Sequence, residues 1–471
     1  MKITYWKLTL SIALGIVLAA CTLPVTRVAQ ADDASQVREE QAYTLGTVAY
    51  AWGFTMTELY RVRHVATTAR DELNKFHHFQ ILFDPTTSTA AGVVSANNAT
   101  VYSTAWLDLS IEPVVLDVPP VPDRYYTMNY IDFYQKVDNI SNLTAGRAGG
   151  SYAFTGPGWE GPLPKGVTRV TMATDHMWII GRTEVKGADD LPAAIAVQTK
   201  YALTVLSEWQ KGARNSLGDN HYEAWPAFDV EDPLNWFAAL NEALRRNPPY
   251  GPDAAVASLF ESIGIGPDKA FDPASLDAAT AAGLRRAVET GQAIVNQDAE
   301  TRLGQQINHW SMIANSVDYV TSRGGFDFLF RSAVALRAQP GQASNENFFN
   351  FAYEDDQGEA LDGGRRYTLT FPEGQEPPVD AFWSVTMYGY PDGFLVENSI
   401  KRYSIGTYNK MLRGDDGSLT ILIQHEPPGA VQENNWLPAP AGRFYLCLRM
   451  YNAKPAALNF DWVPPAVTRA E

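Results

Sequence analysis

The chain has 471 residues, of which 45% are hydrophobic, so it can bury two hydrophobic cores. Its 53 acidic residues outnumber its 37 lysines and arginines, which gives a formal net charge of −16. A negatively charged protein repels a phosphate backbone or an anionic membrane surface unless it carries a local basic patch, and here no run of basic residues is longer than a pair such as Arg245-Arg246. The charge therefore excludes nucleic acid as a partner and an anionic membrane surface as a binding site.

The N-terminal segment predicts export. In residues 1–20, two lysines precede an apolar stretch that is typical of a signal peptide and too short to be interpreted as a spanning helix. The stretch ends in Leu-Ala-Ala-Cys, which resembles a lipoprotein box in which Cys21 carries a diacylglycerol. Residues 21–36 would then form a tether. We therefore predict a protein held by its lipid anchor alone, on the outer membrane and facing the periplasm.

A second cleavage site offers an alternative to the lipid anchor. Cleavage after Ala31, within Ala-Gln-Ala, would release a soluble periplasmic protein. On the lipoprotein route Cys21 is acylated, so Cys447 has no partner for an intrachain disulfide. Cys447 lies in the apolar run 444–450, where we expect a buried and unreactive thiol.

A helix opens the predicted fold, and strands follow it. Apolar residues within 45–60 recur at three- and four-residue spacing, which predicts an amphipathic helix that starts near Val37. Beyond it, short β-branched runs are punctuated by proline and glycine. Residues 114–118 and 167–173 are examples, and both are predicted to be strands.

The middle of the chain is predicted to be helical from about Asp190. Asp232 followed by Pro233 is typical of an N-cap with proline in the first turn. Asp272 and Pro273 repeat this pattern before an alanine-rich segment that ends near Gln297. A further helix is predicted within residues 324–336.

Strand signals return in residues 367–371, 381–388, 419–424 and 443–451. Separate runs of strands and helices favour an α+β fold over a doubly wound α/β fold. We predict two β-rich, sandwich or jelly-roll-like units with a helical region packed between or against them. The predicted bounds are an N-terminal β-rich domain with its leading helix at 37–215, a helical connecting region at 216–345 and a C-terminal β-rich domain at 346–471.

The familiar catalytic motifs are missing from the sequence. It contains no dinucleotide-binding glycine motif, P-loop, nucleophile elbow, zinc-protease motif or cysteine cluster. The adjacent His77 and His78 would point to opposite faces of a strand and would not share a metal. No cofactor is evident. A metal ion bound by distant histidines and carboxylates is an alternative that no motif supports.

The most informative segment covers residues 97–110 and is predicted to be a strand. The alternation of a strand places Tyr102, Thr104, Trp106 and Asp108 on one face and apolar side chains on the other. The first face combines aromatic rings, hydroxyls and a carboxylate, as a ligand cleft does. The alternative is a second buried layer in which Asp108 caps a neighbouring backbone.

Aromatic and charged residues elsewhere extend the predicted site. The candidate ligand-binding residues are Tyr102, Trp106, Arg124, Tyr126, Trp383, Tyr388, Arg402 and Trp436, and the candidate catalytic residues are Asp108 and Asp132. Tyrosine and tryptophan suit ligand binding and the packing of a sandwich rim equally. Arg124 and Arg402 could bind a carboxylate ligand, or each could pair with an internal acid such as Asp132 or Asp380.

Three longer motifs stand out, namely TVYSTAWLDLS at 100–110, PPVDAFWSVTMY at 377–388 and KRYSIG at 401–406. They resemble a bacterial two-domain family, known as domain of unknown function 1254 in the N-terminal half and 1214 in the C-terminal half. The resemblance covers residues 42–205 and 367–465 and implies no settled activity. Relatives carry an acid where this chain has Ala99, so any catalytic task of that acid is in doubt here.

Three functions fit these observations. The first is an envelope enzyme that acts on a small organic molecule in a cleft between the β-rich units, with Asp108 or Asp132 as general base and Tyr102, Tyr388 and Arg402 orienting the substrate. The second is a non-catalytic ligand-binding or adaptor lipoprotein. The third is a metal-dependent enzyme of small molecules.

Overall fold

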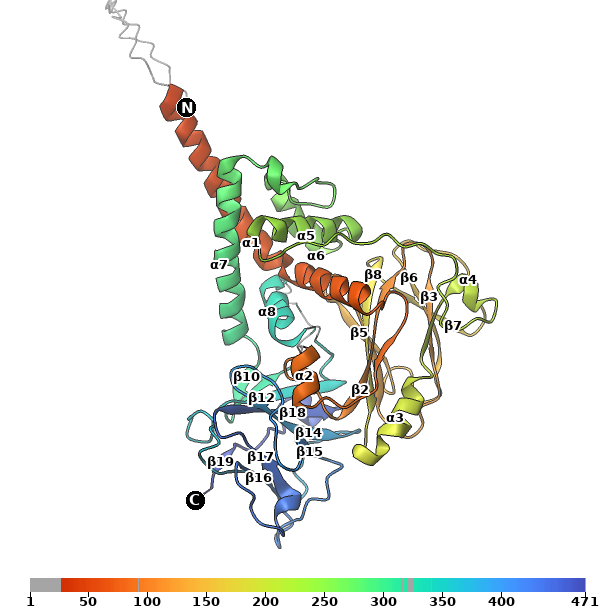
Figure 1. The fold of residues 1–471 in the computed structure, drawn as a ribbon, viewed down its shortest axis with the longest axis vertical. Helices are drawn as coiled ribbons and strands as arrows, with labels where there is room; N and C mark the ends of the chain where they lie inside the picture. The colour runs from red at the N-terminus through yellow and green to blue at the C-terminus, as the bar shows by residue number, and fades with distance from the viewer. Residues whose placement is uncertain are drawn as a thin grey trace, which may run out of the picture.

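The computed structural model describes residues 27–91, 93–314, 317, 319, 325–339 and 341–470. The predicted signal peptide and Cys21 lie outside these residues. Within the described ranges, no helix is long and apolar enough to cross a membrane. Helices and strands are segregated into a helical part and several open sheets, which confirms the predicted α+β class (Figure 1).

Two sheets form the N-terminal sandwich. The larger is antiparallel throughout, in the order β1 (His77–Phe79), β2 (Thr100–Asp108), β8 (His176–Glu184), β4 (Tyr126–Asp132) and β5 (Val137–Ser141). The smaller has the order β7 (Val167–Thr171), β6 (Gly150–Thr155), β3 (Val114–Val118) and β9 (Ala202–Val205). Because side chains alternate along each strand, Leu107 and Met177 of the larger sheet meet Leu116 of the smaller one in a shared core.

In Figure 1 the helical part lies beside the N-terminal sandwich and above the C-terminal sandwich. Its helices are α1 (Arg27–Ala69), α5 (Pro233–Arg246), α6 (Pro252–Ala257), α7 (Ala278–Thr301) and α8 (Phe328–Ala338). The helix α1 lies along α7, and Gly283 of α7 allows the close approach, because a Cβ there would lie 2.3 Å from the carbonyl oxygen of Glu39. The core between the helices includes Trp52, Phe237 and Leu284.

The helix starts follow the predicted capping pattern in one case and depart from it in another. Asp232 caps α5, since its carboxylate accepts from the backbone N–H groups of Leu234 at 2.9 Å and Asn235 at 3.1 Å. Asp272, in contrast, caps only the 3-10 turn Pro273–Ser275. The chain then becomes extended at Leu276, and α7 starts anew behind its own cap, Asp277.

Two further sheets form the C-terminal sandwich. The larger has the order β10 (Gln305–Ile307), β11 (Trp310–Ile313), β12 (Asn347–Ala352), β18 (Phe444–Tyr451), β14 (Trp383–Gly389) and β15 (Ser404–Gly406). The smaller has the order β17 (Trp436–Pro438), β16 (Leu419–Gln424), β13 (Tyr367–Phe371) and β19 (Thr468–Arg469). The strands β10 and β11 fall where the sequence predicted helix, because such short strands carry too few residues for a periodic signal.

Short helices complete the connections. They are α2 (Pro85–Ala91), α3 (Leu191–Gln198), α4 (Leu206–Trp209) and α9 (Pro455–Leu458), with 3-10 turns at Ala188–Asp190, Ser258–Ile263 and Glu433–Asn435. The described part of α1 begins at Arg27, inside the segment that was predicted to be a tether.

The outward faces of the two larger sheets meet at the centre of the molecule. The amide nitrogen of Asn97 donates to the Tyr451 hydroxyl at 2.6 Å, and the Tyr388 hydroxyl donates to the carbonyl of Ala96 at 2.6 Å. Tyr125 also packs against Phe382 and Tyr451 in a small buried cluster. The two sandwiches are therefore joined through specific contacts along one side of this meeting surface.

Candidate functional site

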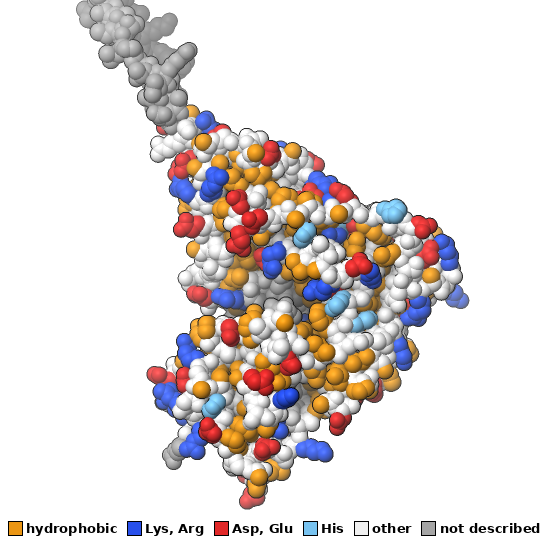
Figure 2. Space-filling view, viewed as in Figure 1, with side chains coloured by type: hydrophobic (Ala, Val, Ile, Leu, Met, Phe, Trp, Pro, Cys, Tyr) orange, Lys and Arg blue, Asp and Glu red, His pale blue; other side chains and the backbone are white. Residues whose placement is uncertain are grey.

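A cavity of about 710 Å³ lies between the two larger sheets and the helices. Figure 2 shows a hollow in this region of the surface, between the helical part and the C-terminal sandwich. The described lining comes from α1, β1, β2, β8, α7, α8, β11, β12 and β18, and from the loop at 93–96. Side chains that are far apart in sequence are thus brought to one place by the meeting of the two sandwiches.

Strand alternation supplies the walls of the cavity. On β2 and β8 the outward residues Tyr102, Thr104, Trp178, Ile180 and Arg182 line it, while the residues between them face the N-terminal core. The register places Tyr102 opposite Arg182 on neighbouring strands. On the opposing sheet, β12 contributes Asn347, Phe349 and Phe351 by the same alternation.

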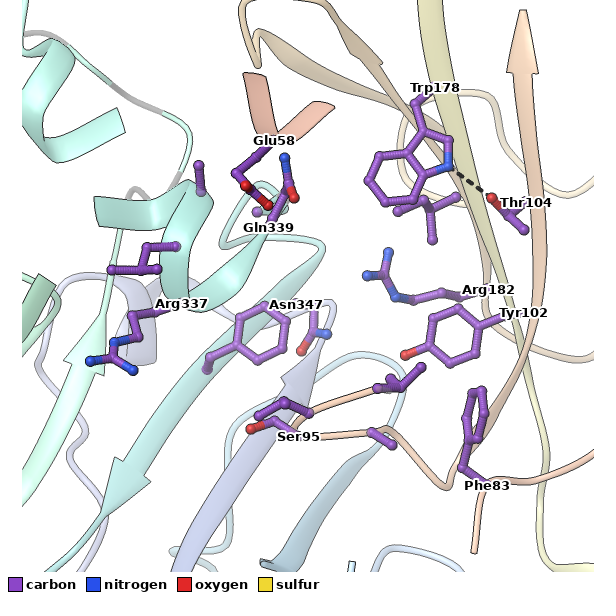
Figure 3. Close-up of a pocket in the computed structure, with 18 of the residues that line it drawn as sticks. Glu58, Phe83, Ser95, Tyr102, Thr104, Trp178, Arg182, Arg337, Gln339 and Asn347 are labelled. Atoms are coloured by element: carbon purple, nitrogen blue, oxygen red, sulfur yellow. Dashed lines mark hydrogen bonds between the residues drawn. The ribbon is translucent and has the colours of Figure 1, made fainter. Parts of the chain in front are cut away.

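One wall is reinforced by stacked indoles. Trp178 donates from its Nε1 to the Thr104 hydroxyl at 2.8 Å, as Figure 3 shows. Trp106 is the register partner of Trp178 on the neighbouring strand, is 1% exposed and stacks on Trp178, with ring centroids 5.2 Å apart and planes within 5°. Trp106 therefore supports the indole that lines the cavity.

The charge of the lining is opposite in sign to that of the whole protein. Its described residues include five arginines, at 61, 70, 182, 337 and 449, and one acid, Glu58. Two of the arginines are paired, Arg61 with Glu58 at 2.8 Å and Arg70 with the buried Glu72. The chain as a whole carries 53 acidic and 37 basic residues, so the cavity concentrates positive charge.

Arg182 is buried without a polar partner among the described residues. Its side chain points into the cavity beside Tyr102 (Figure 3), and the residue is only 7% exposed. Its Nε and Nη1 atoms are buried and make no hydrogen bond. The guanidinium lies over the Tyr102 ring, with its central carbon 5.4 Å from the ring centroid. The guanidinium contacts a π-face and forms no ion pair with a described acid, and Glu346 acts on it only beyond ion-pair distance.

Arg449 is the second buried cation, and it is 3% exposed. Its Nη1 donates to the Tyr388 hydroxyl at 2.8 Å and to the Thr386 hydroxyl at 3.2 Å. Its Nη2 donates to the carbonyl of Ser95 at 2.7 Å, which fixes the loop at 93–96 against the C-terminal sandwich. All these acceptors are neutral, so its positive charge is solvated but not neutralised.

Two buried acids lie near this lining without being part of it. Glu346 is 1% exposed and accepts from the hydroxyls of Ser141 and Tyr125. Burial raises its pKa to about 7, although these hydrogen bonds and the charge of Arg182 oppose the rise. Burial likewise raises the pKa of Glu72 to about 7 against the opposing effect of Arg70.

The two predicted catalytic acids lie outside the lining of this cavity. The Oδ2 of Asp108 lies 3.1 Å from the Nε2 of His176, and its Oδ1 accepts from the backbone N–H and the hydroxyl of Ser110. Burial raises the pKa of Asp108, but the interactions with His176 and Ser110 outweigh it and hold the pKa at about 2. Asp108 caps a local turn, which is the alternative given for it above.

Asp132 has a similar structural role. It accepts from the backbone N–H groups of Tyr134 and Lys136, both at 2.9 Å, and from the hydroxyl of Tyr250. Burial raises its pKa. Because its oxygens stabilise the turn after β4, Asp132 is not placed to contact a ligand in the cavity.

The other predicted ligand-binding residues are distributed over the molecule. Arg124 forms a bidentate pair with Asp190 at 2.7 and 3.1 Å, and not with Asp132. The Tyr126 hydroxyl donates to the carbonyl of Gly146 at 2.7 Å. These side chains therefore stabilise the N-terminal sandwich, and of the predicted set only Tyr102 lines the large cavity.

The C-terminal candidates do not line the large cavity. Trp383 and Arg402 line a second pocket of about 270 Å³. Arg402 donates to the backbone carbonyl of Trp436 at 2.8 Å, and Trp436 is 1% exposed. Tyr388 is buried behind Arg449. The predicted residues thus form no single site.

Sequence reasoning missed the two buried arginines. Arg182 lies two residues beyond Ile180 and four beyond Trp178, so strand alternation puts all three on one face of β8. Placing that face beside Tyr102 also requires the pairing of β8 with β2, which the sequence does not show. Arg449 is surrounded by apolar residues in β18, and the sequence carries no sign that it faces a cavity.

The histidines and the cysteine occupy ordinary structural positions. No three His, Cys, Asp or Glu side chains come together as metal ligands within the described part of the chain. His78 contacts the Ser103 hydroxyl through Nδ1 at 2.9 Å. Cys447 is fully buried and has no disulfide, and burial raises the pKa of its thiol.

Two family models match the chain. The model described as "Protein of unknown function (DUF1254)" matches residues 73–205, which contain the N-terminal sandwich, and "Protein of unknown function (DUF1214)" matches residues 346–455, from β12 to β18. Together they cover about half of the chain. These matches confirm the two-domain resemblance seen in the sequence. No curated protein matches the chain.

A solved structure shares this fold. The crystal structure of the VPA0106 protein from Vibrio parahaemolyticus superposes with a TM-score of 0.69 at 21% identity, over 91% of this chain and 100% of that one. A putative uncharacterized protein from Burkholderia cenocepacia gives a TM-score of 0.42 at 14% identity, over 94% and 96% of the two chains. The first likeness shows that the arrangement of two sandwiches and helices is shared at low sequence identity.

Proposed function

The chain belongs to the two-domain family that joins DUF1254 to DUF1214, and we propose that it binds a small organic molecule in the cavity between these two domains. The observation that carries the proposal is the cavity of about 710 Å³ whose walls come from both domains and from the helices. This volume lies within the range of about 300–1,000 Å³ that is usual for sites of small organic ligands.

The character of the walls supports an organic ligand. Aromatic rings of Phe79, Phe83, Tyr102, Phe349 and Phe351 offer apolar contact area. Hydroxyl, amide and guanidinium groups interrupt this surface at a few points, and such a mixture orients a bound molecule while burial supplies the binding free energy.

The proposal also covers the location of the protein. We place it outside the cytoplasm as a lipid-anchored protein, because the signal-like segment and Cys21 precede the helix α1. This placement would expose the cavity to small molecules that cross the outer membrane. It rests on the sequence alone.

The binding proposal is tested with a neutral fluorescent probe, N-phenyl-1-naphthylamine, whose emission rises in an apolar site. We expect saturable binding by the wild-type protein. The Leu336→Trp variant, which places an indole in the cavity wall, should weaken this binding at least about tenfold, a loss of roughly 1.4 kcal/mol.

The matched control for this test is Leu259→Trp, because Leu259 is 57% exposed and does not line the cavity. It should bind the probe as the wild type does. Ile180→Trp, on the opposite wall, provides a second cavity variant if the first is poorly folded. Saturable binding that is equally strong in both cavity variants would show that the probe binds elsewhere and would contradict the proposal.

A further inference from the structure

We infer that the ligand of this cavity is an organic anion whose acidic group is held by Arg182 and Arg449. The inference rests on the proposed function and deepens it, since it names the chemical class of the ligand. It is carried by the burial of two unneutralised arginines that line one cavity from opposite sandwiches.

The first argument is the charge of the lining. An acidic protein would gain solubility from acids at any surface, and yet the described lining contains five arginines and one glutamate. Pairing with Glu58 and Glu72 satisfies Arg61 and Arg70. Arg337 lies at an exposed position on α8. Arg182 and Arg449 are therefore the buried cations of the lining that form no ion pair with a described acid, and Glu346 acts on Arg182 only beyond ion-pair distance.

The second argument is the cost of burying Arg182. A charged group that is taken out of water without a partner is strongly unfavourable, so buried arginines are normally paired with acids or hydrogen-bonded. Arg182 is 93% buried, and its Nε and Nη1 make no hydrogen bond with any described residue. An anion in the cavity would supply the missing acceptor through a charge-assisted hydrogen bond.

The third argument comes from the opposite wall. Arg449 is held in place by the hydroxyls of Tyr388 and Thr386 and by the carbonyl of Ser95. These neutral acceptors fix the guanidinium without cancelling its charge. A rigid cation of this kind needs no reorganisation when an anion binds, which favours binding of an acidic group.

The rest of the lining describes the body of the ligand. Phe79 and Phe83 come from the N-terminal sandwich side, and Phe349 and Phe351 come from β12. Their rings suit an aromatic or aliphatic body. The chemical class is therefore an organic acid with an apolar body, and not a free inorganic anion.

The test uses two probes of the same shape, 2-naphthoate and its neutral amide, 2-naphthamide, with the full chain in calorimetric titrations. We expect the wild type to bind the carboxylate at least about tenfold more tightly than the amide. In Arg182→Met, the affinity for 2-naphthoate should fall by a similar factor, and the affinity for 2-naphthamide should change less than about twofold.

Thermal unfolding provides the readout that separates binding from structure. Since Arg182 is an unpaired buried cation, Arg182→Met should not lower the unfolding midpoint of the ligand-free protein. A fall in that midpoint together with equal losses for both probes would assign Arg182 a structural role and overturn the inference. Arg182→Lys, which keeps the charge, should retain more affinity for 2-naphthoate than Arg182→Met does.

The control for net charge is Arg214→Met, which removes the same charge at an exposed position away from the cavity. It should leave both affinities unchanged. Parallel titrations with 2-naphthalenesulfonate and 2-naphthyl phosphate identify the oxyanion that binds most tightly. The inference is supported if the affinity for any of the three acids falls in Arg182→Met. Equal binding of 2-naphthoate and 2-naphthamide would overturn the inference and leave the proposed binding function standing. If N-phenyl-1-naphthylamine binds the cavity variants as strongly as the wild type, the proposed binding function itself is contradicted.

Discussion

At the scale of single residues, the interior of this protein holds several charged groups whose settings differ. Asp108 and Asp132 are stabilised by hydrogen bonds from local backbone and side-chain donors. Glu346 accepts hydrogen bonds from two hydroxyl groups, and the buried Nε and Nη1 of Arg182 donate to no described residue. Residue type alone would have ranked the two aspartates above Arg182 as site residues, and the surroundings reverse that order.

Glu346 gives a prediction about pH. Its pKa is raised from 4.5 to about 7 in the folded protein, so the folded state binds a proton more tightly than the unfolded state between these values. Its contribution to the free energy of unfolding is therefore present at low pH and is lost as pH rises from about 4.5 to about 7. Chemical denaturation should show Glu346→Gln gaining stability relative to the wild type over this range, by up to about 3 kcal/mol.

The control for this prediction is Glu160→Gln at an exposed position. Its stability difference from the wild type should stay constant across the same pH range. A constant difference for Glu346→Gln as well would show that the carboxylate is ionised in the folded protein at pH 5, contrary to the expectation.

At the scale of secondary-structure elements, close packing sets the position of α7 against α1. Gly283, Gly46 and Gly291 lie where the two helices approach, and a Cβ at Gly283 would meet backbone atoms of α1. Backbone cannot move aside as a flexible side chain can. The helix pair forms one boundary of the cavity, since Phe54 and Glu58 of α1 and Gln292 of α7 line it.

Gly283→Ala tests this packing, and two effects of opposite sign compete. Helix propensity alone would stabilise the protein by about 1 kcal/mol, because alanine is the better helix former. The contact of 2.3 Å with the Glu39 carbonyl oxygen requires the helices to separate, and overpacking of this kind costs about 1–3 kcal/mol. We expect net destabilisation in urea denaturation, and a more stable variant would show that α1 and α7 are less tightly packed.

At the scale of the whole molecule, two sandwiches and a helical part enclose one cavity. The cavity belongs to neither family domain by itself, because β2 and β8 supply one wall and β12 and β18 the other. The helices α1 and α8 supply further walls. The binding function proposed here therefore requires both domains in one chain.

The predicted lipid anchor also belongs to this scale. Replacement of Cys21 by alanine removes the acceptor thiol, so labelled palmitate should be incorporated by the wild type and not by Cys21→Ala. Fractionation should place the wild type with the membranes and the variant in the soluble fraction. Equal, soluble distribution of both proteins, with a mature chain that starts after Ala31, would show that the second cleavage site is used.

Much of the fold follows from local patterns. The strands Tyr367–Phe371 and Leu419–Gln424 have the predicted bounds, and the α5 cap at Asp232 forms as expected. The helix α7 starts at Asp277 because the carboxylate of that residue caps it. The unpredicted strand β11 pairs with β12, which is a tertiary contact. Strand and cap patterns depend on residues that are close in the sequence. Where two residues such as Asp272 and Asp277 could each begin a helix, the packing of the folded chain selects one of them.

The sequence by itself determined the α+β class, the two-domain family and the alternation that puts Tyr102 and Thr104 on one face of β2. Only the tertiary structure decided that this face meets Arg182, Arg449 and the phenylalanines of β12 around a cavity. The physical reason is that strand alternation is a property of neighbouring residues. The pairing of β2 with β8 joins residues tens of positions apart, and the meeting of the two sandwiches joins residues hundreds of positions apart.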